Sequence, residues 1–112
     1  MKVDLWTYQT NVQKPLNLDG FEVQATDGSI GKIDEATYDV GSSYVVVDTG
    51  PWIFGRKVMI PASAIEKVDL DNRDVFLRLT KDQIKNSPEF DESNYRSEEY
   101  RTRVGSYYGG IY

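Results

Sequence analysis

The sequence predicts a mainly β fold, a small six-stranded barrel with short C-terminal helices, on three observations. Short apolar runs, some alternating with polar residues, recur between residues 21 and 79, and Gly, Pro, Asn and Asp separate them. After residue 79 the apolar spacing changes from a strand period to a helix period. The chain has 112 residues, which fits one domain, and closing a small sheet into a barrel removes its exposed edges.

The first two predicted strands form a hairpin. Residues 21–25 alternate apolar and polar side chains, and Asp27-Gly28 follows, a dipeptide that favours tight turns because Gly accepts a positive φ. The second strand covers residues 30–40, and Gly31 inside it indicates a bulge or a close backbone approach. The remaining predicted strands are residues 44–47, 57–61, 65–70 and 75–79, of which the first is a continuous run typical of a strand buried on both faces.

Two short helices are predicted after the strands. Thr80 and Gln83 have the spacing of a capping box, in which each side chain bonds the backbone N–H of the other residue. A second helix is predicted from about Asp91, where a capping residue precedes Glu92 and Arg96. These two charged residues are four positions apart with the acid first, which is the favourable order on a helix.

We divide the chain into an N-terminal arm, residues 1–17, a barrel, residues 18–79, and a C-terminal helical extension with a Tyr-rich tail, residues 80–112. Gly105 and Gly109-Gly110 are predicted to end the last helix. A domain of about 60 residues buries only ~60% of the surface of its unfolded chain, so a barrel of this size is marginal alone. We therefore expect the arm, the extension or a second copy to cover it.

The composition excludes several classes of function. The chain has no Cys and no His, so it offers no disulfide, no thiolate nucleophile and no imidazole base. It has 18 acidic and 13 basic residues, and this net charge of -5 argues against a nucleic-acid partner. No apolar run approaches the ~20 residues of a membrane span, and the first residues lack the apolar run of a signal peptide. We expect a cytoplasmic protein with no membrane partner, no cofactor and no metal.

Two segments resemble ligand loops and are interpreted as turns. Residues 69–74 resemble the start of a calcium loop, but Asp74 stands where the loop requires Gly, and Thr80 stands where it requires Glu. Residues 28–32 contain two Gly and a Lys, but they lack the spacing of a phosphate loop and the helix that follows one. We expect a hairpin turn at the first segment and a turn with a bulge at the second.

Three carboxylates, Asp34, Glu35 and Asp48, are the candidates for acid–base chemistry. Hydrolysis by paired carboxylates needs two of them facing each other across a substrate. Adjacent residues on a strand point to opposite faces of the sheet, so Asp34 and Glu35 make a poor pair. We therefore expect that the chain is not an enzyme.

Five segments carry a resemblance to a known family, and they are Leu18–Val23, Asp27–Asp34, Lys57–Ile65, Val75–Leu77 and Thr80–Phe90. In this order they resemble the PRC-barrel family, which is named for the C-terminal domain of the photosynthetic reaction-centre H subunit. A related domain forms the second half of a ribosome-maturation factor, and the chain also resembles small stand-alone bacterial members. The resemblance implies a β-barrel that works mainly as a protein-interaction module and brings no catalytic residues. Neither the membrane helix of the H subunit nor the partner domain of the ribosome factor is expected in these 112 residues.

The aromatic residues are the candidates for an interaction surface. An apolar triplet lies at the centre of a predicted loop, where side chains are usually polar, and exposed apolar patches often mark interfaces. Tyr residues gather in the tail, and Tyr suits interfaces because it has an apolar ring and a polar tip. Both groups have a second interpretation, in which they cover the barrel of their own chain. The candidate residues are Trp52, Ile53, Phe54, Tyr95, Tyr100, Tyr107 and Tyr108.

The sequence therefore predicts a non-enzymatic interaction or scaffold module that forms a homodimer or binds another protein. The alternative is a ribosome- or RNA-associated factor, which follows from the resemblance to the ribosome-maturation domain. That alternative needs a basic face, which Lys32, Arg56, Lys57 and Lys67 would have to form together in space.

Overall fold

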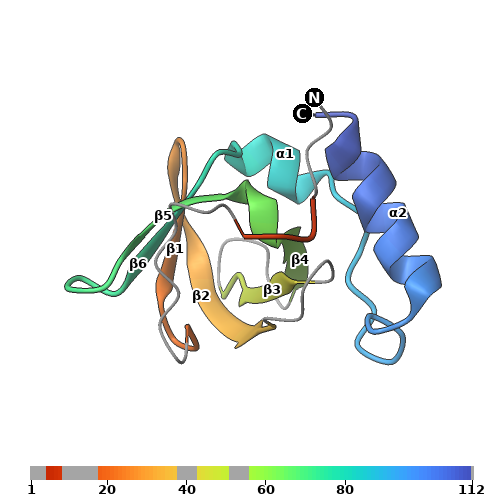
Figure 1. Cartoon of the computed structure of the whole chain (residues 1–112), viewed down its shortest axis with the longest axis horizontal. Helices are drawn as coiled ribbons and strands as arrows, with labels where there is room; N and C mark the ends of the chain where they lie inside the picture. The colour runs from red at the N-terminus through yellow and green to blue at the C-terminus, as the bar shows by residue number, and fades with distance from the viewer. Residues whose placement is uncertain (1–4, 9–17, 38–42, 51–55, 112) are drawn as a thin grey trace.

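Six strands and two α-helices follow one another along the chain in a computed structural model that describes residues 5–8, 18–37, 43–50 and 56–111 (Figure 1). The mainly β fold with a six-stranded sheet is thereby confirmed. The strands are β1 (Glu22–Ala25), β2 (Gly28–Ala36), β3 (Tyr44–Asp48), β4 (Lys57–Pro61), β5 (Ile65–Asp69) and β6 (Asp74–Leu77). The helices are the 3-10 turn η1 (Ala62–Ala64), α1 (Lys81–Lys85) and α2 (Glu98–Gly109).

The strands form one sheet in the order β4-β3-β2-β1-β6-β5. All described strand pairs are antiparallel except β1 with β6, which run parallel. The two strands at the ends of this order, β4 and β5, are consecutive in the chain and are joined by η1. Figure 1 shows the β5–β6 hairpin on the side of the sheet away from α2.

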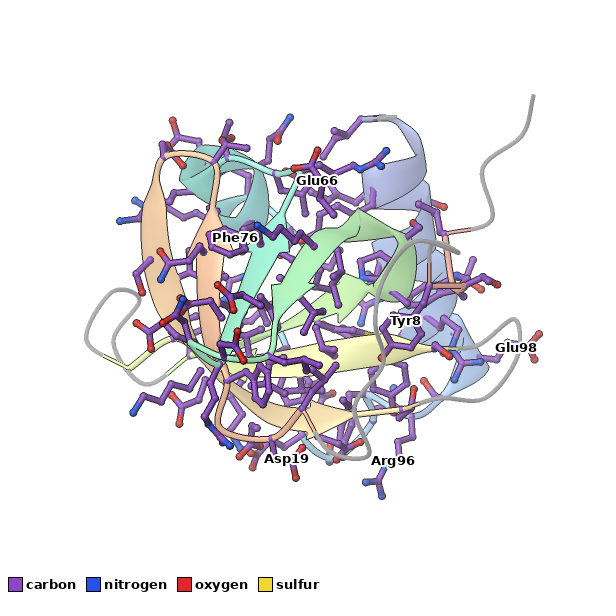
Figure 2. The ribbon with its side chains drawn as sticks, turned by 60° about the vertical axis from the view of Figure 1, so that its left-hand side comes forward. Tyr8, Asp19, Glu66, Phe76, Arg96 and Glu98 are labelled. Carbon is purple, nitrogen blue, oxygen red and sulfur yellow. The ribbon has the colours of Figure 1, made fainter. Side chains whose placement is uncertain are left out.

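The described part of the N-terminal arm, residues 5–8, lies against the sheet. The carbonyl groups of Leu5 and Trp6 accept hydrogen bonds from the backbone N–H groups of Ser63 and Ser43. The Tyr8 hydroxyl, labelled in Figure 2, donates to the carbonyl oxygen of Thr37 at 2.7 Å. The arm therefore contributes to covering the sheet, as a sheet of this size requires.

Gly31 allows two neighbouring strands to approach closely. It faces Val23 on β1, where the register shifts by one residue, and its φ is +147°, a value that side-chain-bearing residues rarely adopt. A Cβ atom placed there would overlap the carbonyl group of Asp48 on β3. Both the bulge and the close backbone approach expected from the sequence are therefore present.

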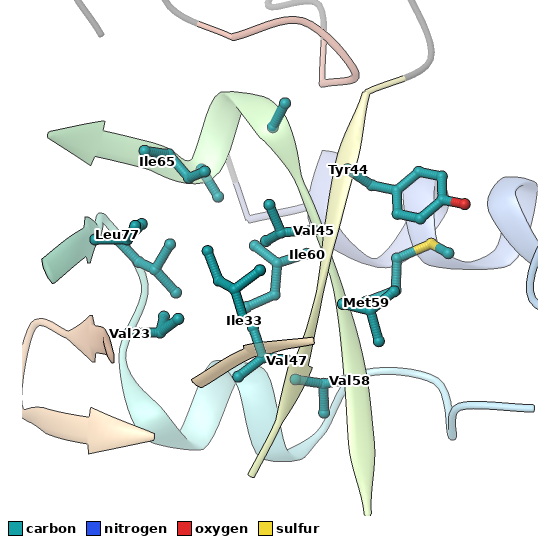
Figure 3. Close-up of a cluster of buried hydrophobic side chains, with 14 of the residues drawn as sticks. Val23, Ile33, Tyr44, Val45, Val47, Val58, Met59, Ile60, Ile65 and Leu77 are labelled. Atoms are coloured by element: carbon teal, nitrogen blue, oxygen red, sulfur yellow. The ribbon is translucent and has the colours of Figure 1, made fainter. Parts of the chain in front are cut away.

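Strand β3 is buried on both faces, as its apolar run predicts, and only Asp48 at its end is exposed. Figure 3 shows Val45 and Ile60 on one side of the β3–β4 pair, among the side chains of the other strands. Tyr44 and Met59 lie on the other side, toward α2. We call this second side of the sheet its outer face. Helix α2 packs against β4 there, which explains why neither face of β3 needs polar residues.

Helix α1 begins at the predicted capping box. The Thr80 hydroxyl accepts from the N–H of Gln83 at 3.2 Å, and the Gln83 side chain accepts from the N–H of Thr80 at 2.9 Å. These bonds satisfy two donors that a helix start leaves without intrahelical partners. Ile84 is the residue of α1 that is buried.

Helix α2 starts later than the sequence predicts, and it ends at Gly109 with Gly110 as its cap, at the second of the two expected stops. Ser97 caps its first turn, and the helix runs through Gly105, because its buried stripe continues to Tyr108. The expected helical pair does not form: Glu92 pairs with Lys57 instead, and Arg96 pairs with a residue of β2. Tertiary ion pairs thus replace the local pair on which the early start was based.

Some strand bounds also differ. The second strand is described as Gly28–Ala36, and residues 38–40 of its predicted range lie outside the described residues. The last strand ends at Leu77, because the chain then turns toward the start of α1.

Candidate functional site

The apolar triplet Trp52, Ile53 and Phe54 lies outside the described residues, but the residues that flank it are described. β3 and β4 pair as far as Asp48 opposite Lys57. Beyond that pair, the backbone N–H of Thr49 donates to the carbonyl oxygen of Arg56 at 3.3 Å, and the Thr49 hydroxyl donates to the same oxygen. The two ends of the segment that carries the triplet are therefore held together at the end of the sheet.

A hollow of about 430 Å³ lies beside this end of the sheet. Asp48, Thr49 and Gly50 line it on one side, and Ile30 and Gly31 of β2 line it on another. Its volume falls in the range of about 300–1,000 Å³ that is typical of sites for small ligands or single side chains.

Two of the four candidate Tyr residues are buried in their own chain. The side chains of Tyr100 and Tyr108 are fully buried and lie with Val104 on the face of α2 that meets the rest of the protein. Burial raises the pKa of Tyr100 to about 12, because the phenolate form would lose its hydration. These positions correspond to the second interpretation of the tail, in which it covers the sheet.

The other two Tyr residues are partly buried. The Tyr107 hydroxyl donates to the carbonyl oxygen of Gln83 and so joins α2 to α1. The Tyr95 hydroxyl donates to Glu35 of β2 at 2.9 Å, and Arg96 contacts the same carboxylate oxygen at 3.0 Å. Burial, and then the nearby carboxylate of Glu35, raise the pKa of Tyr95. This network fastens the segment before α2 to the sheet.

The three candidate carboxylates have separate partners. Asp34 pairs with Lys57 at 3.0 Å, Glu35 belongs to the network with Tyr95, and Asp48 accepts from the backbone N–H of Gly50 at 2.9 Å. Hydrogen bonds to Glu92 and Asp34 raise the pKa of Lys57 above its usual value. Among the described residues, no two of these three carboxylates share any of these partners.

The turn after β5 satisfies its own polar groups. The Asp69 carboxylate accepts from the backbone N–H groups of Asp71 and Asn72, and from the Asn72 side chain at 2.8 Å. These hydrogen bonds, that of the Asn72 side chain first, lower the pKa of Asp69. The segment forms the hairpin turn expected from its sequence. Within the described parts of the chain, no group of three or more Asp or Glu residues is placed to hold a metal ion.

Each of the four basic residues considered for an RNA-binding face lies beside backbone carbonyl groups or acidic residues. The Arg56 guanidinium donates to the carbonyl groups of Lys85 and Ser87 at 3.1 and 2.8 Å, and so holds the end of α1. Lys57 lies between two acids. Lys32 faces Glu22 on β1 and Asp48 on β3, and Lys67 directly follows Glu66 on β5.

A surface that sequence reasoning missed lies on the β5–β6 hairpin. We call it the hairpin groove: a hollow of about 840 Å³ lined by residues 66–71 and by Phe76. Leu70 is 44% exposed, and no other large apolar side chain in the described part of the chain is as exposed. Figure 2 labels Glu66 and Phe76, which belong to the two neighbouring strands of this hairpin. The signal in the sequence is Leu70 itself, an apolar residue directly before a polar turn.

A row of charged residues crosses the sheet beside this groove. The register aligns one charged residue of each strand with a charged residue of the next, and residues that face each other across strands project from the same face. Basic and acidic residues alternate from β4 to β1, whereas the last three positions, on β1, β6 and β5, are all acidic. From β4 to β5 the row is Lys57, Asp48, Lys32, Glu22, Asp74 and Asp69.

Among the described residues, no helix is both long enough and apolar enough to cross a membrane. Comparison of the chain with models of known protein families gave no match, and comparison with curated proteins gave none either.

Proposed function

We propose that this chain is a non-enzymatic protein-interaction module of the PRC-barrel type, and that it associates with a second copy of itself. The resemblance of five segments to that family motivates the barrel. The strand order supports it, because the two end strands, β4 and β5, are linked directly through η1. A short link between the two end strands favours a sheet that curls toward a barrel, although among the described residues no β4–β5 pairing closes it and β5 keeps an unpaired edge.

The observation that carries the proposed self-association is the clamp at the base of the apolar triplet. Thr49 and Arg56 hold the two ends of this segment together at the end of the β3–β4 pair. A hollow of about 430 Å³ lies at the same place. In the proposed dimer Trp52, Ile53 and Phe54 form the contact, and their burial stabilises the small domain by mass action.

The tail has a different role in this proposal. Tyr100 and Tyr108 are fully buried against their own chain, and Tyr95 and Tyr107 bond to other elements of it. They support the contact surface by holding α2 on the sheet.

Sedimentation equilibrium over a range of protein concentrations tests the self-association. We expect a dimer for the wild-type chain and a monomer with an unchanged circular dichroism spectrum for the Trp52→Ser, Phe54→Ser double variant. The variant Leu70→Ser removes an exposed apolar side chain elsewhere and should remain dimeric. A wild-type chain that sediments as a monomer at every concentration would contradict the proposed dimer.

A further inference from the structure

Strand β5 ends the sheet, and no described strand pairs with its other edge along residues 66–69. An open edge presents backbone N–H and C=O groups to which an extended segment of another chain can add as a further strand.

Two apolar side chains lie near this edge: Leu70 directly follows β5, and Phe76 lies one strand further in, on β6. Leu70 is 44% exposed, and Phe76 on β6 is only partly buried. The Lys67 ammonium lies over the Phe76 ring, 5.7 Å from its centroid, so the two side chains share one face of the β5–β6 pair. The hollow of about 840 Å³ at these residues has room for more than one side chain of an added strand.

The charges around the hollow determine which strand fits it. Glu66, Asp69 and Asp71 line the groove with Lys67 as its one base, so the lining has three negative charges and one positive charge. Beside the groove, Asp74 faces an acid on each neighbouring strand. Like charges directly opposite each other on a sheet are destabilising, and a cation from a partner relieves that repulsion.

A second copy of this chain does not have the matching charge. The whole chain has a net charge of -5, and its own groove would meet an identical acidic groove. The irregular register between Ile65 and Lys67, together with the charges of β5, disfavours pairing with an identical strand.

We propose that the hairpin groove binds an extended segment of a partner protein that carries Lys or Arg residues between apolar residues, added as a strand beside β5. This inference rests on the proposed interaction function but not on self-association. Apolar side chains of the partner cover Leu70 and Phe76, and its basic side chains lie near Glu66, Asp69 and Asp71.

A short blocked peptide that alternates lysine with valine is the probe, and the same peptide with glutamate in place of lysine is its control. Backbone amide chemical shifts of the full-length chain are followed as each peptide is added. We expect saturable shifts at residues 66–71 and at Phe76 with the lysine peptide, weaker binding at higher salt, and no binding of the glutamate peptide.

Two charge reversals distinguish an effect of the groove on peptide binding from an effect of the net charge of the chain. Asp71→Lys and Glu98→Lys change the net charge equally, but Glu98 lies on α2, well away from Glu66 in Figure 2. We expect about tenfold weaker binding for Asp71→Lys and for Leu70→Ser, as the loss of one good interface contact implies, and unchanged binding for Glu98→Lys.

Three outcomes would overturn the inference: no saturable shifts in the groove, equal binding of the glutamate peptide, or equal weakening by the two charge reversals. Shifts of the groove amides on dilution without peptide would assign the groove to a second copy and would also overturn it. Sedimentation equilibrium measures dimerisation independently of peptide binding. A negative result in the peptide titration therefore does not contradict the proposed self-association.

Discussion

Gly31 occupies the position where the surroundings most strictly require a glycine. Its φ of +147° is unfavourable for any residue with a Cβ, and the missing Cβ leaves room for the backbone of β3. Gly50 also has a positive φ, of +55°, but no atom lies within 4 Å of the position that its Cβ would take. Comparing substitutions at the two glycines therefore separates two contributions to stability: the backbone conformation, which both share, and close packing, which only Gly31 has.

We expect Gly31→Ala to destabilise the protein more than Gly50→Ala, as measured by urea denaturation. The change at Gly50 adds a Cβ in the left-handed region, which costs about 1–2 kcal/mol. The change at Gly31 adds an overlap with the Asp48 carbonyl group to a similar backbone cost, so the loss should exceed about 2 kcal/mol. Equal losses for the two variants would show that β2 and β3 do not approach as closely as described.

At the scale of the elements, α2 explains the concentration of Tyr residues at the end of the chain. Tyr100, Val104 and Tyr108 are spaced four residues apart and form one buried stripe, while the rest of the helix is largely polar. The Ser97 cap and the network of Tyr95 and Arg96 with the sheet fix where the helix begins. The helix is thus held mainly by its stripe, because exposed ion pairs contribute little.

We expect Tyr108→Ala to lower the free energy of unfolding by about 3–5 kcal/mol, the range for removing a buried aromatic side chain. The loss should not depend on protein concentration, because the side chain packs on its own chain. Glu99→Ala, at an exposed position of the same helix, should change stability by less than about 0.5 kcal/mol. A loss for Tyr108→Ala that disappears at high protein concentration would instead place this side chain in a dimer contact.

At the scale of the whole molecule, the charge of -5 is unevenly placed. Bases and acids face each other over β4, β3 and β2, whereas Glu22, Asp74 and Asp69 face one another over β1, β6 and β5. The end of the sheet that is not next to α2 therefore has an acidic outer face. A sequence retains such unfavourable pairs at a cost in stability, which is typical of surfaces that serve function.

We expect Asp74→Asn to stabilise the protein in low salt, because it removes two like-charge pairs that each cost roughly 0.2–1 kcal/mol. The gain should shrink at high salt, where exposed charges are screened. Asp34→Asn is the matched control: it breaks the ion pair with Lys57 and should give no gain. Thermal denaturation at two salt concentrations measures both effects, and a destabilised Asp74→Asn variant would show that Asp74 has a structural role.

Particular residues show how far prediction from the sequence reached. The capping box of Thr80 and Gln83 and the bulge at Gly31 were predictable because each depends on residues close in the chain or on the conformational freedom of one residue. The start of α2 was not, because Glu92 and Arg96 bind partners on β4 and β2 rather than each other. Helical spacing cannot reveal a competing partner that is distant in the chain.

The sequence by itself determined the mainly β class, the number of strands and their approximate places, since these follow from local periodicity and turn residues. Only the tertiary structure decided that Tyr100 and Tyr108 are buried in their own chain and that Leu70 borders an open groove. Strand register alone brought Glu22, Asp74 and Asp69 into one acidic row. The physical reason is that burial and cross-strand pairing depend on which distant segments meet, and a residue's local sequence does not contain that information.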